Sequence, residues 1–171
     1  MKTVNLVMKF VFGLCAVALL AGAWVSPAAA QEPTTTPARE YVRLEYALKR
    51  LAIRAGVQQD LIEGARQYAD LTEEFIEDQQ AAGRDTSALE AALSTFRTEI
   101  DQAEALNAEA KRVLDEKAGF DADGKVVDRA QAADTIESAK RALQDARQTL
   151  TTAAQDFRQA VRDYRQDQRG N

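Results

Sequence analysis

The sequence predicts an all-α fold, a long antiparallel three-helix bundle of the spectrin-like, coiled-coil-like kind, and three observations support it. No proline follows Pro37 in the 171-residue chain, so no proline interrupts a helix beyond that point. Apolar residues recur at spacings of three and four over most of the chain, which is the period of one helix face. Glycines at positions 83, 119 and 124 separate three such stretches, one for each helix.

The first 30 residues have the composition of a cleaved export signal. Lys2 and Lys9 form a positive start, residues 10–25 are apolar or glycine, and Ala28 to Ala30 are small residues that a signal peptidase accepts. The 16 residues of 10–25 extend about 24 Å as a helix, short of the roughly 30 Å core of a bilayer. We therefore expect an exported protein, periplasmic or extracellular, that begins near Gln31 and keeps no stable membrane anchor. A retained, uncut anchor is the alternative.

Residues 31–37 are predicted to form a flexible tether, and residues 38–171 a single helical-bundle domain, whose first helix covers about 38–82. Two apolar stripes in different phases lie on this helix, and both are interpreted as core. The first comprises Tyr41, Leu44, Leu48, Leu51 and Ala55, and the second comprises Val57, Leu61, Gly64, Tyr68, Leu71 and Phe75. The apolar stripe shifts to another side of the helix between Ala55 and Val57, so a helix break at Gly56, which would give a four-helix bundle, is the alternative. We favour one continuous helix, because no proline or capping residue stands there.

The second and third helices are expected over about 87–117 and 128–167. Ser87 and Glu90 form a capping box for the second helix, and Asp128 is the predicted N-cap of the third. The second helix carries a core stripe of Leu89, Leu93, Phe96, Ile100, Ala103, Leu106, Ala110 and Leu114. The third carries a heptad pattern of Ile136, Ala139, Leu143, Ala146, Leu150, Ala153, Phe157, Ala160 and Tyr164. Alanine alternates with large residues in this pattern, which predicts close helix packing.

The second helix is shorter than the first, which leaves part of the first helix without a neighbour. At 1.5 Å per residue, about 15 to 20 Å of the first helix projects beyond position 117. The projecting part carries Tyr41, Leu44, Leu48 and Leu51. We expect the loop with Phe120, Val126 and Val127 to cover some of these side chains and a second copy of the protein to cover the rest. These four residues are therefore the candidate interaction surface.

Composition excludes several function classes for the part after residue 30. This part has no cysteine, histidine, tryptophan or methionine, so it lacks the usual ligands of zinc, iron and copper and the base of a serine or cysteine triad. Without Lys2 and Lys9, 20 basic residues remain against 27 acidic ones, and the net charge of −7 disfavours nucleic acid as a partner. We predict a protein that is not an enzyme and that needs no cofactor.

The segment 118–128 contains Asp121, Asp123 and Asp128 close to Gly124. Carboxylates beside a glycine turn are typical of calcium loops, so these three residues are candidate metal ligands. The EF-hand spacing is not met, because Gly119 and Ala130 occupy the first and twelfth positions. A turn that ends in the Asp128 N-cap accounts for the same residues and is the favoured interpretation.

Two segments, Gly83–Leu93 and Ala118–Val126, resemble a group of exported bacterial coiled-coil proteins of unknown function. The resemblance implies the helical fold and no particular activity. A weaker similarity links Leu71-Thr72-Glu73-Glu74 and Leu150-Thr151-Thr152-Ala153-Ala154 to the Leu-Thr-x-x-Gln motif of small periplasmic chaperones of the Spy and CpxP type. Phe75 replaces the glutamine in the first segment, and Gln155 comes one position late in the second.

These features together predict an exported protein that acts by protein–protein contact, as a structural or interaction module that binds another protein or itself. A periplasmic holdase chaperone with an apolar groove is one alternative. A weakly calcium-responsive binding protein that uses Asp121, Asp123 and Asp128 is the other.

Overall fold

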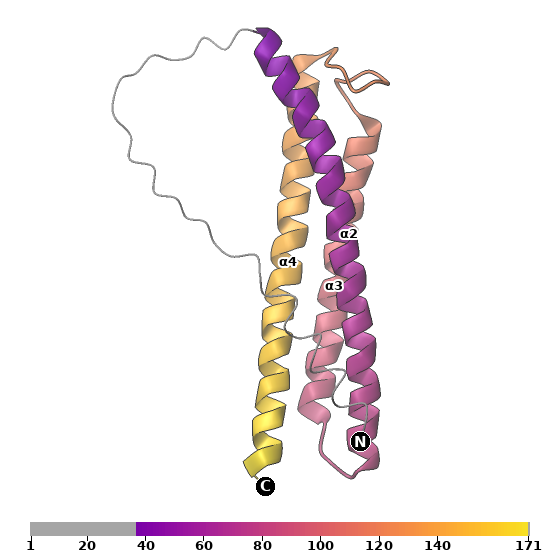
Figure 1. Cartoon of the computed structure of the whole chain (residues 1–171), viewed down its shortest axis with the longest axis vertical. Helices are drawn as coiled ribbons and strands as arrows, with labels where there is room; N and C mark the ends of the chain where they lie inside the picture. Colours follow the sequence, from indigo (N-terminus) through magenta and orange to yellow (C-terminus); the bar gives the residue numbers. More distant parts are fainter. Residues whose placement is uncertain (1–36, 171) are drawn as a thin grey trace, which may run out of the picture. The chain divides into compact units, whose positions relative to one another are not determined.

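The computed structural model describes residues 37–170, and over that range it is a three-helix bundle (Figure 1). The helices are α2 (Pro37–Ala81), α3 (Ser87–Glu116) and α4 (Arg129–Gly170). The chain runs down α2, up α3 and down α4, and each helix contacts the other two. The predicted all-α three-helix fold is confirmed. The predicted export signal and most of the tether lie outside the described residues.

Helix α2 passes through Gly56 without a break, as we favoured, and the four-helix alternative is wrong. Its buried positions continue the phase of the first apolar stripe at spacings of three and four. They are Leu48, Leu51, Ala55, Gln58, Ile62, Ala69, Thr72 and Ile76, with Ala65 partly buried. The assignment of the second stripe to the core was therefore wrong for Val57, Leu61, Gly64 and Leu71, whereas Tyr68 and Phe75 are partly buried against the core. Val57, Leu61 and Leu71 are 54%, 45% and 48% exposed, because they lie on a different side of the helix from the positions that face α3 and α4.

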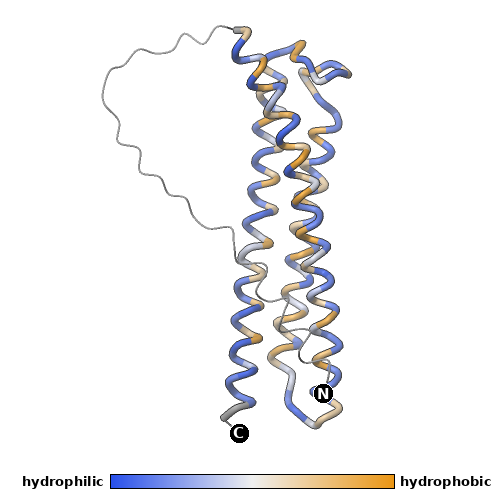
Figure 2. Tube along the Cα trace, viewed as in Figure 1, coloured by the Kyte–Doolittle hydropathy of each residue, from blue (hydrophilic) through white to orange (hydrophobic). Residues whose placement is uncertain are grey.

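The core of α3 and α4 follows the predicted stripes closely. On α3, the one difference is that Asn107 is fully buried where Leu106 was expected. Around the lower part of the bundle, Phe96 and Phe157 stack with ring centroids 4.6 Å apart, and Tyr68 meets Phe157 edge-on at 5.8 Å. A separate cluster of aliphatic and alanine side chains, joined by Phe120, fills the upper part. Figure 2 shows apolar and polar residues alternating along all three helices.

The starts of α3 and α4 are fixed by side chains that accept backbone amide protons. Asp128 Oδ1 accepts from the Gln131 amide at 3.1 Å, so the predicted N-cap of α4 is confirmed. The start of α3 differs from the prediction. Asp85 Oδ1 accepts from the Ser87 amide at 3.0 Å, and Thr86 Oγ1 donates to Glu90 at 2.5 Å. Glu90 thus interacts with Thr86, one residue before the expected Ser87.

Two arginines hold α2 and α3 in register through reciprocal ion pairs. Arg66 on α2 contacts Asp101 at 2.8 Å and Glu104 at 2.5 Å on α3. Arg97 on α3 contacts Asp70 at 3.0 Å and Glu73 at 2.7 Å on α2. Each arginine is followed four positions later by aspartate and seven positions later by glutamate. The two helices are antiparallel, so the arginine of each helix contacts the aspartate and the glutamate of the other.

Candidate interaction surface

The predicted overhang at the start of α2 is largely covered by α3, α4 and the chain's own loop together. Leu48 and Leu51 are 6% and 5% exposed and belong to the upper core cluster, and Leu44 is partly buried against it. Tyr41, at 39%, is the one member of the predicted interaction surface that stays exposed. Our expectation that Leu48 and Leu51 would need a second copy to cover them is therefore corrected.

The loop contributes to this cover because its turn folds it back over α2. Gly119 has φ +83°, and a Cβ there would lie 2.1 Å from the Ala132 amide nitrogen, so only glycine fits. Phe120 pairs with Val126 in an isolated antiparallel bridge, and Phe120 is 8% exposed within the upper core cluster. The sequence predicted partial cover by this loop, and side chains of α3 and α4 supply the rest.

Two ion pairs connect the N-terminal part of α2 to the loop and to α4. Lys125 Nζ lies 2.8 Å from Glu45, and Arg129 lies 2.5 Å from Glu40. The hydrogen bond from Lys125 lowers the pKa of Glu45, and the hydrogen bond from Arg129 lowers the pKa of Glu40. Both glutamates of this part of α2 are thus occupied by partners in the loop and α4.

The three candidate calcium ligands do not converge in the structure. Asp121 Oδ1 accepts from the amides of Asp123 and Lys125 at 2.9 and 2.8 Å, and Asp128 caps α4. Among residues 37–170, no group of three or more acidic, histidine or cysteine side chains could hold a metal ion. The segment is a turn whose carboxylates bind backbone amides, which is the interpretation that we favoured.

A second apolar face runs along the outside of α2. We call it the α2 outer face and define it as Val42, Tyr46, Ile53, Val57, Leu61 and Leu71, whose exposed fractions are 63%, 66%, 69%, 54%, 45% and 48%. Their spacing of mostly four or seven residues places them on one side of the helix. Gly64 lies on the same side, while Tyr68 and Phe75 continue it toward the aromatic core and are partly buried.

The outer face stands apart from the rest of the described surface. Large apolar side chains with high exposure in residues 38–168 all belong to α2, apart from Val127 in the loop. In α3 and α4 the large apolar residues are buried or partly buried on the inner side of the bundle. Helix α2 therefore has two apolar faces, and its partners α3 and α4 cover only one of them.

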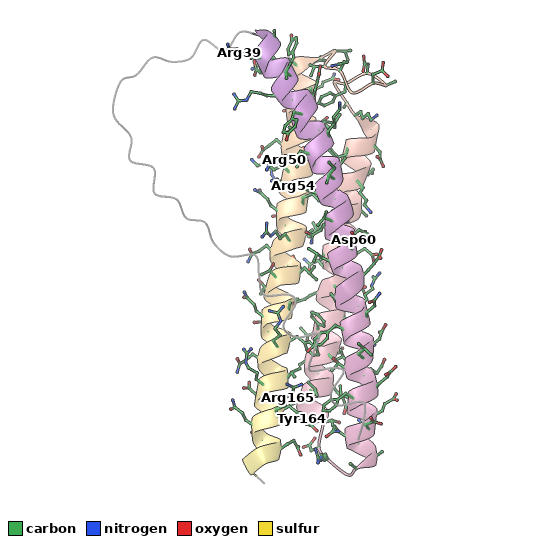
Figure 3. All side chains as sticks on the ribbon, viewed as in Figure 1. Arg39, Arg50, Arg54, Asp60, Tyr164 and Arg165 are labelled. Carbon is green, nitrogen blue, oxygen red and sulfur yellow. The ribbon has the colours of Figure 1, made fainter. Side chains whose placement is uncertain are left out.

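Charge along α2 is divided between its two halves. The first half carries five exposed cations that make no ion pair with another described residue, Arg39, Arg43, Lys49, Arg50 and Arg54. The second half carries five exposed anions that likewise make no ion pair with another described residue, Asp60, Glu63, Glu74, Glu77 and Asp78. Figure 3 shows Arg39, Arg50 and Arg54 along the upper half of α2, with Asp60 below them.

The division is sharp because the oppositely charged residues in each half already have partners. In the first half, Glu40 and Glu45 pair with Arg129 and Lys125. In the second half, the one cation, Arg66, pairs with acidic residues of α3. The ion pairs inside the bundle thus leave the α2 outer face with one basic end and one acidic end.

The comparisons with known proteins assign this chain to no family, so it is classified by its fold alone. No protein-family model, curated protein or solved structure matches this chain. Between residues 37 and 170, no helix combines the length and the apolar character that a membrane span requires. The class that the structure defines is an all-α three-helix bundle, and its most distinctive surface is the α2 outer face.

Sequence reasoning found three of the six residues of this face but placed them inside the bundle. Val57, Leu61 and Leu71 were recognised as a helical stripe, whereas Val42, Tyr46 and Ile53 were not grouped with them. One signal could have separated the two faces. The heptad of Leu48, Leu51 and Ala55 continues without a slip through Gln58 and Ile62, which leaves the second stripe on another side of the helix.

Proposed function

We propose that this protein acts by protein–protein contact through the α2 outer face, as an exported, non-enzymatic interaction module in the cell envelope or outside the cell. The observation that carries the proposal is six large, exposed apolar side chains aligned on a single helix. Isolated exposed apolar residues are ordinary on protein surfaces, but a contiguous set bordered by charged residues is typical of a binding surface. Export is inferred from residues 1–30 alone.

Helix-to-helix docking is the recognition mode that fits this surface. Its residues recur at the spacing by which an amphipathic helix binds a neighbour, and they extend over most of α2. The face is also stiff, since α2 is one continuous helix held to α3 by the Arg66 and Arg97 ion pairs. A preformed face loses little conformational freedom on binding, which favours affinity.

Photo-crosslinking in the producing cells tests the proposal. A photoreactive phenylalanine at Val57 places the probe in the outer face, and the same residue at Arg141, exposed on α4, is the matched control. We expect a discrete covalent adduct from position 57 and none from position 141. No adduct from position 57, or equal adducts from both positions, would contradict the proposal. A broad smear of adducts would indicate a holdase that binds many unfolded chains.

A Leu61→Glu variant adds an internal control to that experiment. Leu61 is 45% exposed, so a glutamate there remains solvated and the bundle keeps its fold. The adduct from position 57 should be lost in this variant while its helical circular dichroism is unchanged. Intact mass of the purified protein, with a chain beginning at Gln31, tests the export part of the proposal separately.

A further inference from the structure

We propose that the α2 outer face binds the same face of a second copy of this chain, with the two α2 helices antiparallel. This inference rests on the proposed function and names its partner. Three observations lead to it: the apolar face itself, the division of charge along it, and the arrangement of its residues about Val57.

Charge division favours an identical partner over an arbitrary one. The unpaired cations of the first half of α2 and the unpaired anions of its second half are equal in number, five of each, and all ten are exposed. When two copies align antiparallel, the basic half of each lies beside the acidic half of the other. A parallel pair in register would bring five cations beside five cations, which is repulsive.

The apolar residues are arranged almost symmetrically about Val57. Ile53 and Leu61 lie four positions to either side of it, and Tyr46 and the partly buried Tyr68 lie eleven positions to either side. A two-fold axis beside Val57 would therefore bring isoleucine to leucine and tyrosine to tyrosine. Two-fold dimers are the commonest assemblies of identical chains, and the same patch then serves both copies.

The face is long enough for a stable contact. From Val42 to Leu71 it extends about 44 Å at 1.5 Å per residue. Gly64 lies opposite Arg50 in the symmetric register and has no neighbouring atom within 4 Å of where a Cβ would stand. That space accommodates the aliphatic stem of the arginine, which packs against apolar surface while its charge stays in water.

The chain contains one other apolar segment that could cover the face, residues 10–25. That segment has no charged residue, so it would form no ion pairs with the basic half or the acidic half of α2. It is also the part that the sequence predicts to be removed. A second copy uses both the apolar residues and the charges, and we therefore commit to it.

Charge reversal with mixing tests this inference. An acidic variant, Arg43→Glu/Arg50→Glu/Arg54→Glu, leaves the unpaired charges of both halves of α2 net negative. A basic variant, Asp60→Lys/Glu74→Lys/Asp78→Lys, leaves the unpaired charges of both halves net positive. All six positions are exposed and lack ion pairs with described residues, so the bundle should keep its fold. Sedimentation equilibrium should show dimers for the parent protein. Each variant alone should dissociate at a concentration at least about tenfold higher, and an equimolar mixture should form dimers again.

A matched control keeps the change in net charge and moves it off the face. Arg141→Glu/Arg147→Glu/Arg165→Glu reverses three exposed cations of α4, and its dimers should be as stable as those of the parent. The inference is overturned if the parent protein is monomeric at every concentration, or if the mixture of the two variants forms no dimers.

Cysteine crosslinking tests the direction of the helices, in a Cys15→Ser background and with the protein produced from the full sequence. In the antiparallel pair, Val57→Cys oxidises to a covalent dimer by itself. Val42→Cys crosslinks poorly alone and efficiently with Leu71→Cys. A parallel pair would crosslink Val42→Cys with itself, and that result would overturn the antiparallel arrangement.

The two proposals can fail separately. A monomeric protein that still gives a discrete adduct from position 57 with a different protein would refute self-association and leave the proposed function standing. A monomer with no adduct from position 57 would refute both. Intact mass shows whether residues 10–25 are present in the sample, so a monomer that retains them would point to that segment as the cover.

Discussion

The two apolar faces of α2 contain the same kinds of residue in opposite surroundings. Ile62 on the inner face is fully buried, whereas Ile53, nine positions earlier on the outer face, is 69% exposed. The inner face even includes Gln58 and Thr72, which are 7% exposed. The comparison teaches that hydrophobicity along a helix does not by itself identify its core side. That side is chosen by where the neighbouring helices can pack.

The largest expected effect comes from truncating one isoleucine on each face. Ile62→Ala should lower the free energy of unfolding by about 2 to 5 kcal/mol, because it removes buried methyl groups and leaves a cavity. Ile53→Ala should change it by no more than about 0.5 kcal/mol in the monomer. Urea unfolding followed by circular dichroism at low protein concentration measures both. Equal effects would mean that the two faces are not distinguished as the structure shows.

A polar residue on the inner face offers the opposite test. Gln58 Nε2 is buried and has no hydrogen-bond partner among the described residues. Gln58→Leu should therefore raise the free energy of unfolding by about 1 kcal/mol, because it removes an unsatisfied donor from the core. Val57→Leu, one position away on the outer face, is the control and should be neutral. Destabilisation by Gln58→Leu would show that the core around Ala55 and Asn107 depends on this amide.

A substitution at Gly56 tests whether α2 is continuous or broken at this position. It is exposed within α2, and a Cβ there would meet no atom within 4 Å. Gly56→Ala should stabilise the bundle by about 0.5 to 1 kcal/mol, because alanine loses less backbone entropy in a helix interior. Thermal unfolding measures the effect. A loss of stability would contradict the uninterrupted α2.

The smallest expected effect is the pH dependence of the ion pairs between α2 and α3. The hydrogen bonds from Arg97 and Arg66 lower the pKa values of Glu73 and Glu104. Their stabilising contribution is therefore present above the unfolded value of about 4.3 and lost as the pH falls through the lower folded values. The urea midpoint should fall in acid, and it should fall less in Arg97→Gln. An identical pH profile for this variant would show that the Arg97 pair contributes nothing, as many exposed pairs do.

Much of the fold could be predicted from local features of the sequence. The helix bounds at residues 37–81, 87–116 and 129–170 follow the last proline, the turns at Gly83 and Gly119, and the Asp128 cap. The core of α3 and α4 follows their clear apolar stripes, apart from Asn107 on α3 and Ala132 and Thr135 at the start of α4, which are buried outside those stripes. These features could be predicted because helix formation and capping depend on residues a few positions apart.

The candidate surface needed the tertiary structure. The sequence by itself determined that α2 is helical and carries two apolar stripes and a division of charge. Only the packing of α3 and α4 decided which stripe is buried, that these helices and the loop together cover Leu48 and Leu51, and which charges are left without partners. The physical reason is that helix propensity is local, whereas burial and ion pairing depend on residues far apart in the chain that meet only when the three helices come together.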